Sequence, residues 1–246
     1  MAKYLIVNAD DFGLSSGVNR GIIECAERGV LTSASLMVRW PTAAEAAGYV
    51  NQLEASSAKS ENPWGRRISL GLHIDLGEWV LRDADWVPLY SVVDTRNAPA
   101  VRAEIYRQLS EFRRLVGRNP THLDSHQHVH RREPAYSIML QLATELRIPL
   151  RECDSRIRYC GDFYGQGAEG EPWPELISSA NLKQIIQSLP EGTTELGCHP
   201  GYGETLQSPY RSERAREVAT LCDPTVLSRL TELDIHLRSF DSFVLD

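Results

Sequence analysis

Two adjacent carboxylates at the end of an apolar segment, Asp10 and Asp11 in YLIVNADDFG, are the residues most suggestive of chemistry. Residues 4–9 are typical of a buried strand, and Gly13 allows the chain to turn soon afterwards. Since consecutive side chains of a regular strand point to opposite faces, both acids can share a site only where the strand ends. Such a pair beside a hydrophobic run indicates a bound cation or a proton-transfer role. The alternative is a turn or helix N-cap role.

Three histidine-bearing segments are further candidates. ISLGLHIDLGE carries His73, which is followed by Asp75 and Glu78, and TTELGCHPGYG carries His199 before a Pro-Gly turn. The third segment, THLDSHQHVHRREP, has acidic and imidazole groups at alternate positions: Asp124, His126, His128 and His130. On an extended backbone that spacing places them on one side. A single histidine would more simply be a core or surface residue, and for His130 we expect a surface position leading into the next helix.

Strand-like and helix-like segments alternate along the chain. The predicted strands are 4–9, 33–38, 68–74, 121–125, 148–152, 194–198 and 235–239. The predicted helices are 17–28, 43–54, 100–116, 134–146, 181–189, 213–220 and 224–232. This alternation predicts βαβ units and a largely parallel sheet. Its length favours an α/β fold of the distorted (β/α) barrel type, with about seven parallel strands in a single domain over residues 1–246.

Two segments interrupt this alternation. Residues 55–66 are polar, and we expect a surface excursion there. Residues 160–175 are rich in glycine and contain Phe163, Tyr164 and Trp173, so they are either a substrate lid with aromatic platforms or a long loop packed by its own rings.

The candidate residues all lie at or just after the carboxyl ends of different predicted strands. In an α/β barrel these ends converge on one face, where active sites form. One carboxylate and two imidazoles would hold a divalent metal, and the nitrogen ligands favour Zn, Co, Ni or Mn over Mg. A bound metal supplies what amide hydrolysis needs, while a second acid and another histidine can exchange protons with water and the leaving amine. The sequence therefore predicts metal-assisted hydrolysis.

Composition limits the classes of partner. With 26 basic and 33 acidic residues the formal charge is −7, which argues against nucleic acid or an anionic membrane. No apolar stretch is long enough to span a bilayer, and we see no signal peptide. The five cysteines are scattered without CxxC pairs, so we expect reduced thiols in a cytoplasmic protein, with a homodimer as the default assembly. Cys198 beside His199 is a weaker candidate nucleophile in an apolar strand.

The blocks VNADDFG, GLHIDLGE, HLDSHQHVH and the CHP turn resemble, in order and spacing, the YdjC-like carbohydrate deacetylases, which include chitooligosaccharide and hopanoid-biosynthesis deacetylases. The resemblance extends from Tyr4 to about Phe243. It implies a barrel like that of polysaccharide deacetylases, and removal of the acetyl group from an N-acetylated amino sugar with a divalent metal. Carried onto this sequence, the metal ligands are Asp11, His73 and His126, the general base is Asp10 and the general acid is His199.

Details within this assignment stay open. Spacing alone does not decide between His126 and His128 as ligand, and the resemblance favours His126 as the first histidine after Asp-Ser. Asp124 and His128 would then support the ligands or contact substrate, and Tyr202 is a candidate sugar contact, as are Trp79 and Trp86. Ligand type favours Zn, whereas family members often contain Mg.

Three alternative functions account less well for the sequence. A metal-dependent phosphoesterase would use a similar barrel, but the chain has no obvious N-terminal HxH pair. Glycoside hydrolysis by paired carboxylates leaves the histidines without a role. A non-catalytic sugar-binding relative would be expected to lack the base or the acid, and both Asp10 and His199 are present.

Overall fold

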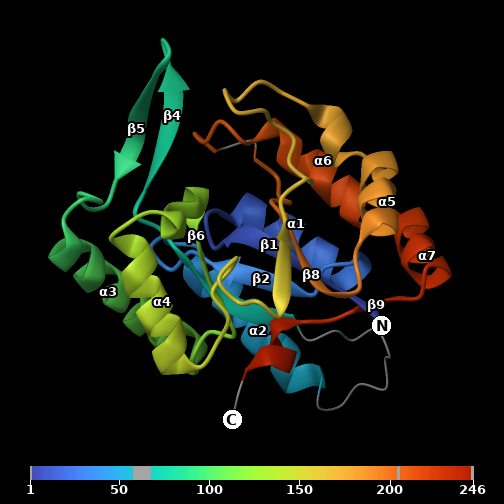
Figure 1. The fold of residues 1–246 in the computed structure, drawn as a ribbon, viewed down its shortest axis with the longest axis horizontal. Coiled ribbons are helices and arrows are strands. Elements are labelled where there is room, and N and C mark those ends of the chain that lie inside the picture. The colour runs from blue at the N-terminus through green and yellow to red at the C-terminus, as the bar shows by residue number, and fades with distance from the viewer. Residues whose placement is uncertain (1, 58–67, 204–205, 245–246) are drawn as a thin grey trace.

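A curled parallel sheet organises the chain in the computed structural model, which describes residues 2–57, 68–203 and 206–244 (Figure 1). The strand order is β6-β3-β2-β1-β8-β7, with β9 also paired to β1, and all these pairings are parallel. The seven strands are β1 Lys3–Phe12, β2 Ser33–Leu36, β3 Ser69–Ile74, β6 Leu123–Ser125, β7 Ile157–Cys160, β8 Gly192–Cys198 and β9 Ile235–Leu237. The predicted distorted barrel of about seven parallel strands is therefore confirmed, as an open half-barrel.

Helices cover this sheet wherever the sequence predicts them. They are α1 Ser16–Arg28, α2 Ala43–Ser57, α3 Ala98–Val116, α4 Ala135–Leu146, α5 Ser179–Ser188, α6 Ser212–Leu221 and α7 Pro224–Glu232. The described residues also form three short 3₁₀ helices, η1 His126–Arg131, η2 Pro174–Ile177 and η3 Phe240–Phe243. Capping side chains fix some of the boundaries: Ser15 accepts a hydrogen bond from the amide of Val18 at the start of α1, as expected for an N-cap.

Both faces of the sheet are buried. Leu5 and Val7 of β1 point into the main core with the helices, while Ile6 points to the opposite face. There Ile6 packs with Ile157, Phe240 and Phe243, so the last helical turn, η3, covers the inner side of the half-barrel. Because both faces are buried, the strand sequences are largely continuous apolar runs.

A hairpin of β4 Gly77–Arg82 and β5 Asp85–Ser91 was not predicted from the sequence. Figure 1 shows it projecting away from the rest of the chain. Its residues are mostly half-buried or exposed, and Trp86 is 61% exposed. Because the hairpin lies outside the main sheet, it lacks the apolar run by which the other strands are recognised.

The predicted strand at 148–152 is wrong as a regular strand. Only Leu150 forms a bridge, to Leu123 of β6, and the chain turns immediately after it. Pro149 has no amide hydrogen to donate, and Glu152 adopts a left-handed φ of 64°, which ends the extended backbone. The strand in this part of the chain is β7, which follows the turn and was missed.

The two irregular segments have different outcomes. Residues 58–66 of the predicted surface excursion lie outside the described residues, whereas 55–57 complete α2. In the glycine-rich segment, Phe163 is buried in the main core, Tyr164 stacks on Tyr210 and Trp173 is 45% exposed.

All five cysteines are free thiols, and among the described helices there is none with the length and apolarity to span a membrane.

Candidate active site

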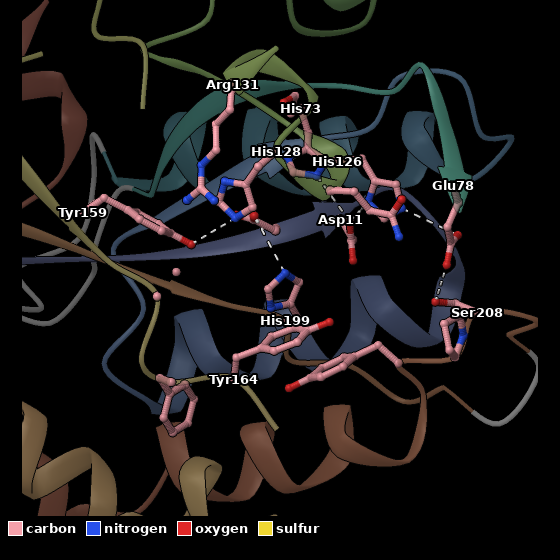
Figure 2. A pocket seen from close by; sticks show the side chains of 18 of the residues that line it. Asp11, His73, Glu78, His126, His128, Arg131, Tyr159, Tyr164, His199 and Ser208 are labelled. Atoms are coloured by element: carbon pink, nitrogen blue, oxygen red, sulfur yellow. Dashed lines mark hydrogen bonds and ion pairs between the residues drawn. The ribbon is translucent and has the colours of Figure 1, made fainter. Parts of the chain in front are cut away.

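The carboxyl ends of the parallel strands surround a cavity of about 450 Å³. Asp10 and Asp11 come from β1, His73 from β3, His126 from the residue after β6, and His199 from the residue after β8. The side chains that line it include the predicted Asp10, Asp11, His73, His126, His128 and His199. Figure 2 shows all of these except Asp10 with labels. The parallel topology therefore brings together residues that are up to 189 positions apart in the sequence.

A break in the alternation of β1 lets both acids face this cavity. Pairing with β2 shifts register between Ala9 and Phe12, and Asp11 has a left-handed φ of 66°. A bulge of this kind turns one side chain out of its regular position. The sequence alone predicts that the strand ends before the two acids. Instead β1 continues to Phe12, and the bulge is what allows both acids to face the cavity.

Asp11, His73 and His126 converge with the spacing of a metal centre. Oδ1 of Asp11 lies 3.4 Å from Nε2 of His73 and 3.1 Å from Nδ1 of His126. Donor atoms in a tetrahedral shell with bonds near 2.0–2.1 Å are about 3.3 Å apart. A potential donor atom from each of the three lies within 4.8 Å of the others. Nε2 of His73, which faces Asp11, is buried without a hydrogen-bond partner among the described residues, so it is an unused donor atom.

A carboxylate also lies behind each of these two imidazoles. Nδ1 of His73 is 2.8 Å from Oδ1 of Asp124, and Nε2 of His126 is 3.6 Å from Oε2 of Glu78. The second oxygen of Glu78 accepts a 2.8 Å hydrogen bond from the Ser208 hydroxyl. Metal-binding histidines characteristically carry such a carboxylate on the nitrogen that faces away from the ion. The donor set and its surroundings therefore fit a divalent metal.

The electrostatic field at these imidazoles favours a cation. Burial opposes protonation of His73, but Asp124 and Asp10 outweigh it and raise its pKa to about 10. In the same way Asp11 and Glu78 overcome burial and raise the pKa of His126 to about 9. The negative field that holds a proton on each ring would equally stabilise a metal ion in their place.

Asp10 is held by an arginine instead. Nη1 and Nη2 of Arg151 each lie 2.7 Å from an oxygen of Asp10, and the same guanidinium contacts Asp124 and Glu195. Burial opposes ionisation of Asp10, but Arg151 outweighs it, so the pKa of Asp10 lies below its ordinary value. In a further cluster of potential ligand atoms, Asp10, His73 and Asp124, both carboxylates thus already have this arginine as a cationic partner.

His199 faces Asp10 across the cavity. Its Nε2 lies 3.8 Å from Oδ2 of Asp10, and within residues 2–57, 68–203 and 206–244 its buried Nδ1 has no hydrogen-bond partner. Burial lowers the pKa of His199 to about 4, so the ring is neutral at pH 7. Its backbone amide donates to Glu217, and the rings of Tyr164 and Tyr210 pack beside it. Figure 2 shows Tyr164 directly below His199, and both line the cavity.

The alternation argument for the histidine segment is wrong beyond Ser125. The chain leaves β6 there and forms η1, in which Gln127 and His128 have left-handed φ values of 48° and 51°. His126 consequently faces Asp11, whereas His128 lies near the Tyr159 hydroxyl, 3.4 Å from its Nε2. The expected surface position of His130 is also wrong: it is 1% exposed, because its side chain and amide both bond to Ser125.

Other predicted contacts lie elsewhere. Tyr202 does not line the cavity; its hydroxyl donates to Glu24, and Arg20 packs over its ring. Trp79 and Trp86 belong to the hairpin, which contributes Glu78 to the cavity. Cys198 is fully buried with its thiol donating to the Asn8 carbonyl, and burial raises its pKa well above the ordinary value, as expected for an inert thiol.

Sequence reasoning missed two arginines and a glutamate at the site. Arg151 follows the apolar IPL segment, where a charged residue is itself a signal of a buried partner. Arg214, whose guanidinium contacts Oδ2 of Asp11, lies on the same helical face as Val218 and Leu221, so the 3.6-residue period could have revealed its burial. Glu78 was noted in its motif but given no role.

Known carbohydrate deacetylases are similar in sequence to this chain over almost its whole length. The sequence pattern of YdjC-like proteins matches residues 4–232. A carbohydrate deacetylase of Geobacillus stearothermophilus is 30% identical over 264 residues that cover 99% of both chains. A chitooligosaccharide deacetylase of Serratia marcescens is 33% identical over 258 residues, covering 98% of this chain and 99% of the relative.

Solved structures share the fold. An Enterococcus faecalis protein described as a candidate cellobiose-phosphate cleavage protein superimposes over 100% of both chains, with a TM-score of 0.76 and 26% identity. A family 4 carbohydrate esterase from Streptomyces lividans, solved with acetate, has a TM-score of 0.54 at 12% identity over 98% of this chain and 95% of its own, which shows a shared fold alone. The sequence match over residues 4–232, together with the two deacetylase relatives that align over nearly the whole chain, shows that this chain belongs to the YdjC-like family.

Proposed function

We propose that this protein is a metal-dependent N-deacetylase that hydrolyses the acetamide of an N-acetylated amino sugar, of the chitooligosaccharide type or a related glycoconjugate, to a free amine and acetate. The relatives that match over its full length are named as carbohydrate and chitooligosaccharide deacetylases. The observation that carries the proposal is the pair of imidazoles around Asp11, each backed by its own carboxylate.

A divalent ion held by Asp11, His73 and His126 would polarise the acetyl carbonyl and lower the pKa of a water molecule. Two nitrogen donors favour Zn over Mg as the native ion. The second oxygen of Asp11 is held by Arg214, so Oδ1 remains directed at the two rings. We therefore expect the carboxylate to bind through one oxygen.

Asp10 would accept the proton of the attacking water. Arg151 keeps it ionised at neutral pH and fixes both of its oxygens, so the base is present in one orientation. Asp10 and Asp11 are adjacent, and the bulge between them lets one act on protons while the other binds the ion.

His199 is the proposed donor to the leaving amine. Because its pKa is lowered to about 4, the ring is neutral before the reaction and must receive a proton during turnover. Asp10 lies 3.8 Å away, close enough for the proton it takes from water to pass to His199 with a small movement. The aromatic ring of Tyr164 lies beside His199, where it could contact a sugar face.

The test is acetate release from N,N′-diacetylchitobiose and a panel of N-acetylated sugars, using protein stripped with a chelator and reloaded with Zn, Co, Mn, Ni or Mg. We expect activity that depends on added metal and disappears in Asp10→Asn. Metal binding without acetate from any sugar would reject these substrates, and absence of metal binding would reject the mechanism.

A further inference from the structure

We propose that His128, His130 and Glu152 form a second site for a zinc-like divalent cation, separate from the Asp11 centre. The three residues come from η1 and from the turn that follows Leu150, so the half-barrel brings them together beside the cavity. This inference does not depend on the deacetylase function, since it concerns only the binding of an ion.

The distances match those of the first centre. Oε2 of Glu152 lies 3.7 Å from Nδ1 of His128 and 3.4 Å from Nε2 of His130. A tetrahedral zinc shell places its donor atoms about 3.3 Å apart, so small movements would close all three around one ion. As with the first three residues, each can offer one donor atom within 4.8 Å of the others.

Two of these donor atoms are buried with nothing to bind. Nδ1 of His128 and Nε2 of His130 have no hydrogen-bond partner in the part of the chain that the structure describes, and the His130 side chain is 1% exposed. Leaving such nitrogens unpaired is costly, and a cation would satisfy both at once. Their opposite nitrogens are already placed, since Nδ1 of His130 contacts the Ser125 hydroxyl at 2.6 Å and Nε2 of His128 approaches Tyr159. Both rings are therefore oriented as metal-binding imidazoles usually are.

Arg131 is the competing partner for the carboxylate. Its Nε and Nη2 lie 2.6 and 2.7 Å from the two oxygens of Glu152. A carboxylate oxygen has two lone-pair sites, so Oε2 can accept from Arg131 while it binds an ion on its other side. In that arrangement Arg131 would orient Glu152 rather than exclude the cation.

An ion at this site would also change what His128 presents to the cavity. When one nitrogen of an imidazole binds a metal, the other carries the proton. Nε2 of His128, which faces the cavity beside Tyr159, would then act only as a hydrogen-bond donor. The second site would thus fix the tautomer of a residue at the wall of the first.

The experiment measures zinc bound per chain by equilibrium dialysis at buffered free zinc, followed by elemental analysis. We expect two ions for the wild type, one for His130→Ala and one for Glu152→Gln. His126→Ala, which removes a proposed ligand of the first centre, should also keep one. The double variant His126→Ala/His130→Ala should keep none.

His236→Ala is the matched control, because this histidine is 54% exposed and distant in the sequence from both clusters; it should still bind two ions. An amount of bound zinc that is the same in the wild type, His130→Ala and Glu152→Gln would overturn the proposal, because Glu152 would then serve Arg131 alone. A wild type with one ion that is lost in His130→Ala and Glu152→Gln but kept in His126→Ala would uphold the second site and reject the first centre instead. Since zinc is counted directly, a protein without deacetylase activity still gives a readable answer.

Discussion

Replacement of Glu78 tests whether the outer carboxylates tune the proposed active-site metal. Glu78 lies 3.6 Å from the outward nitrogen of His126, whereas Asp124 lies 2.8 Å from that of His73 in a fully buried position. Loss of such outer partners typically weakens metal binding 10- to 100-fold. Because the Glu78 contact is the longer one, we expect Glu78→Gln to weaken zinc binding about tenfold, or about 1.4 kcal/mol, at the lower end of that range.

Asp124→Asn should weaken zinc binding about 100-fold, at the upper end of the range for such outer partners. Its contact with His73 is a hydrogen bond at 2.8 Å, and the same carboxylate accepts from Ser35 at 2.6 Å. Arg151 keeps its two bonds to Asp10 in this variant, so the buried guanidinium still has a partner. Ser208→Ala is the control, because it removes a hydroxyl from Glu78 and leaves the carboxylate facing His126.

The assay is competition for zinc with a chromophoric chelator at fixed pH, combined with acetate release at saturating zinc. We expect the affinities to rank wild type and Ser208→Ala above Glu78→Gln, and Glu78→Gln above Asp124→Asn. The measurement should use His130→Ala as background, so that zinc at the second cluster does not obscure the first. Equal affinities for Glu78→Gln and the wild type, or a reversed order of the two carboxylates, would refute the reasoning.

Three further predictions concern single residues. Asp10→Asn should retain zinc while turnover falls about 10³-fold; a variant that loses zinc yet keeps residual activity would contradict the base role. His126→Ala should abolish metal-dependent acetate release, whereas His128→Ala should retain it, and the opposite result would move the ligand assignment to His128. Glu217→Gln should flatten the pH dependence of stability, since burial raises the pKa of Glu217 from 4.5 to about 8. Between these values the unfolded chain has released a proton that the folded chain keeps, so the free energy of unfolding falls as pH rises. Chemical denaturation at pH 5 and pH 8 should show a larger decrease for the wild type than for Glu217→Gln; equal decreases would contradict the assignment.

The sequence was sufficient for the periodic parts of the fold. Each predicted helix has a counterpart in the structure, because helix boundaries depend on local signals such as Ser15 before α1 and Gly117, which ends α3 with a left-handed φ of 80°. Six of the seven predicted strands also exist, since burial on both faces leaves a continuous apolar run. The β4–β5 hairpin lacks that signal, and its Trp86 is largely exposed.

Residues that act through long-range pairing were harder to predict. Asp11, His73 and His126 were identified by a family resemblance, and the strand-end argument explains why the structure brings them together. Nothing local to Arg151 or Arg214 indicates which carboxylate each will contact, because those partners lie 141 and 203 positions away. Which buried charges pair with one another depends on the tertiary fold, so these partners can be assigned only from the three-dimensional structure.

The histidine segment shows most clearly how backbone conformation decides chemistry. On an extended chain the alternating histidines would have faced one point and formed a single crowded site. The left-handed φ values at Gln127 and His128 turn the chain into η1 and divide the group. Gln127 stabilises this turn, since its amide side chain both accepts from and donates to the backbone of Trp79 at 2.8 Å. His126 is left with Asp11 and the other two with Glu152, so one sequence motif supplies candidate ligands to two neighbouring clusters that could each hold a metal ion.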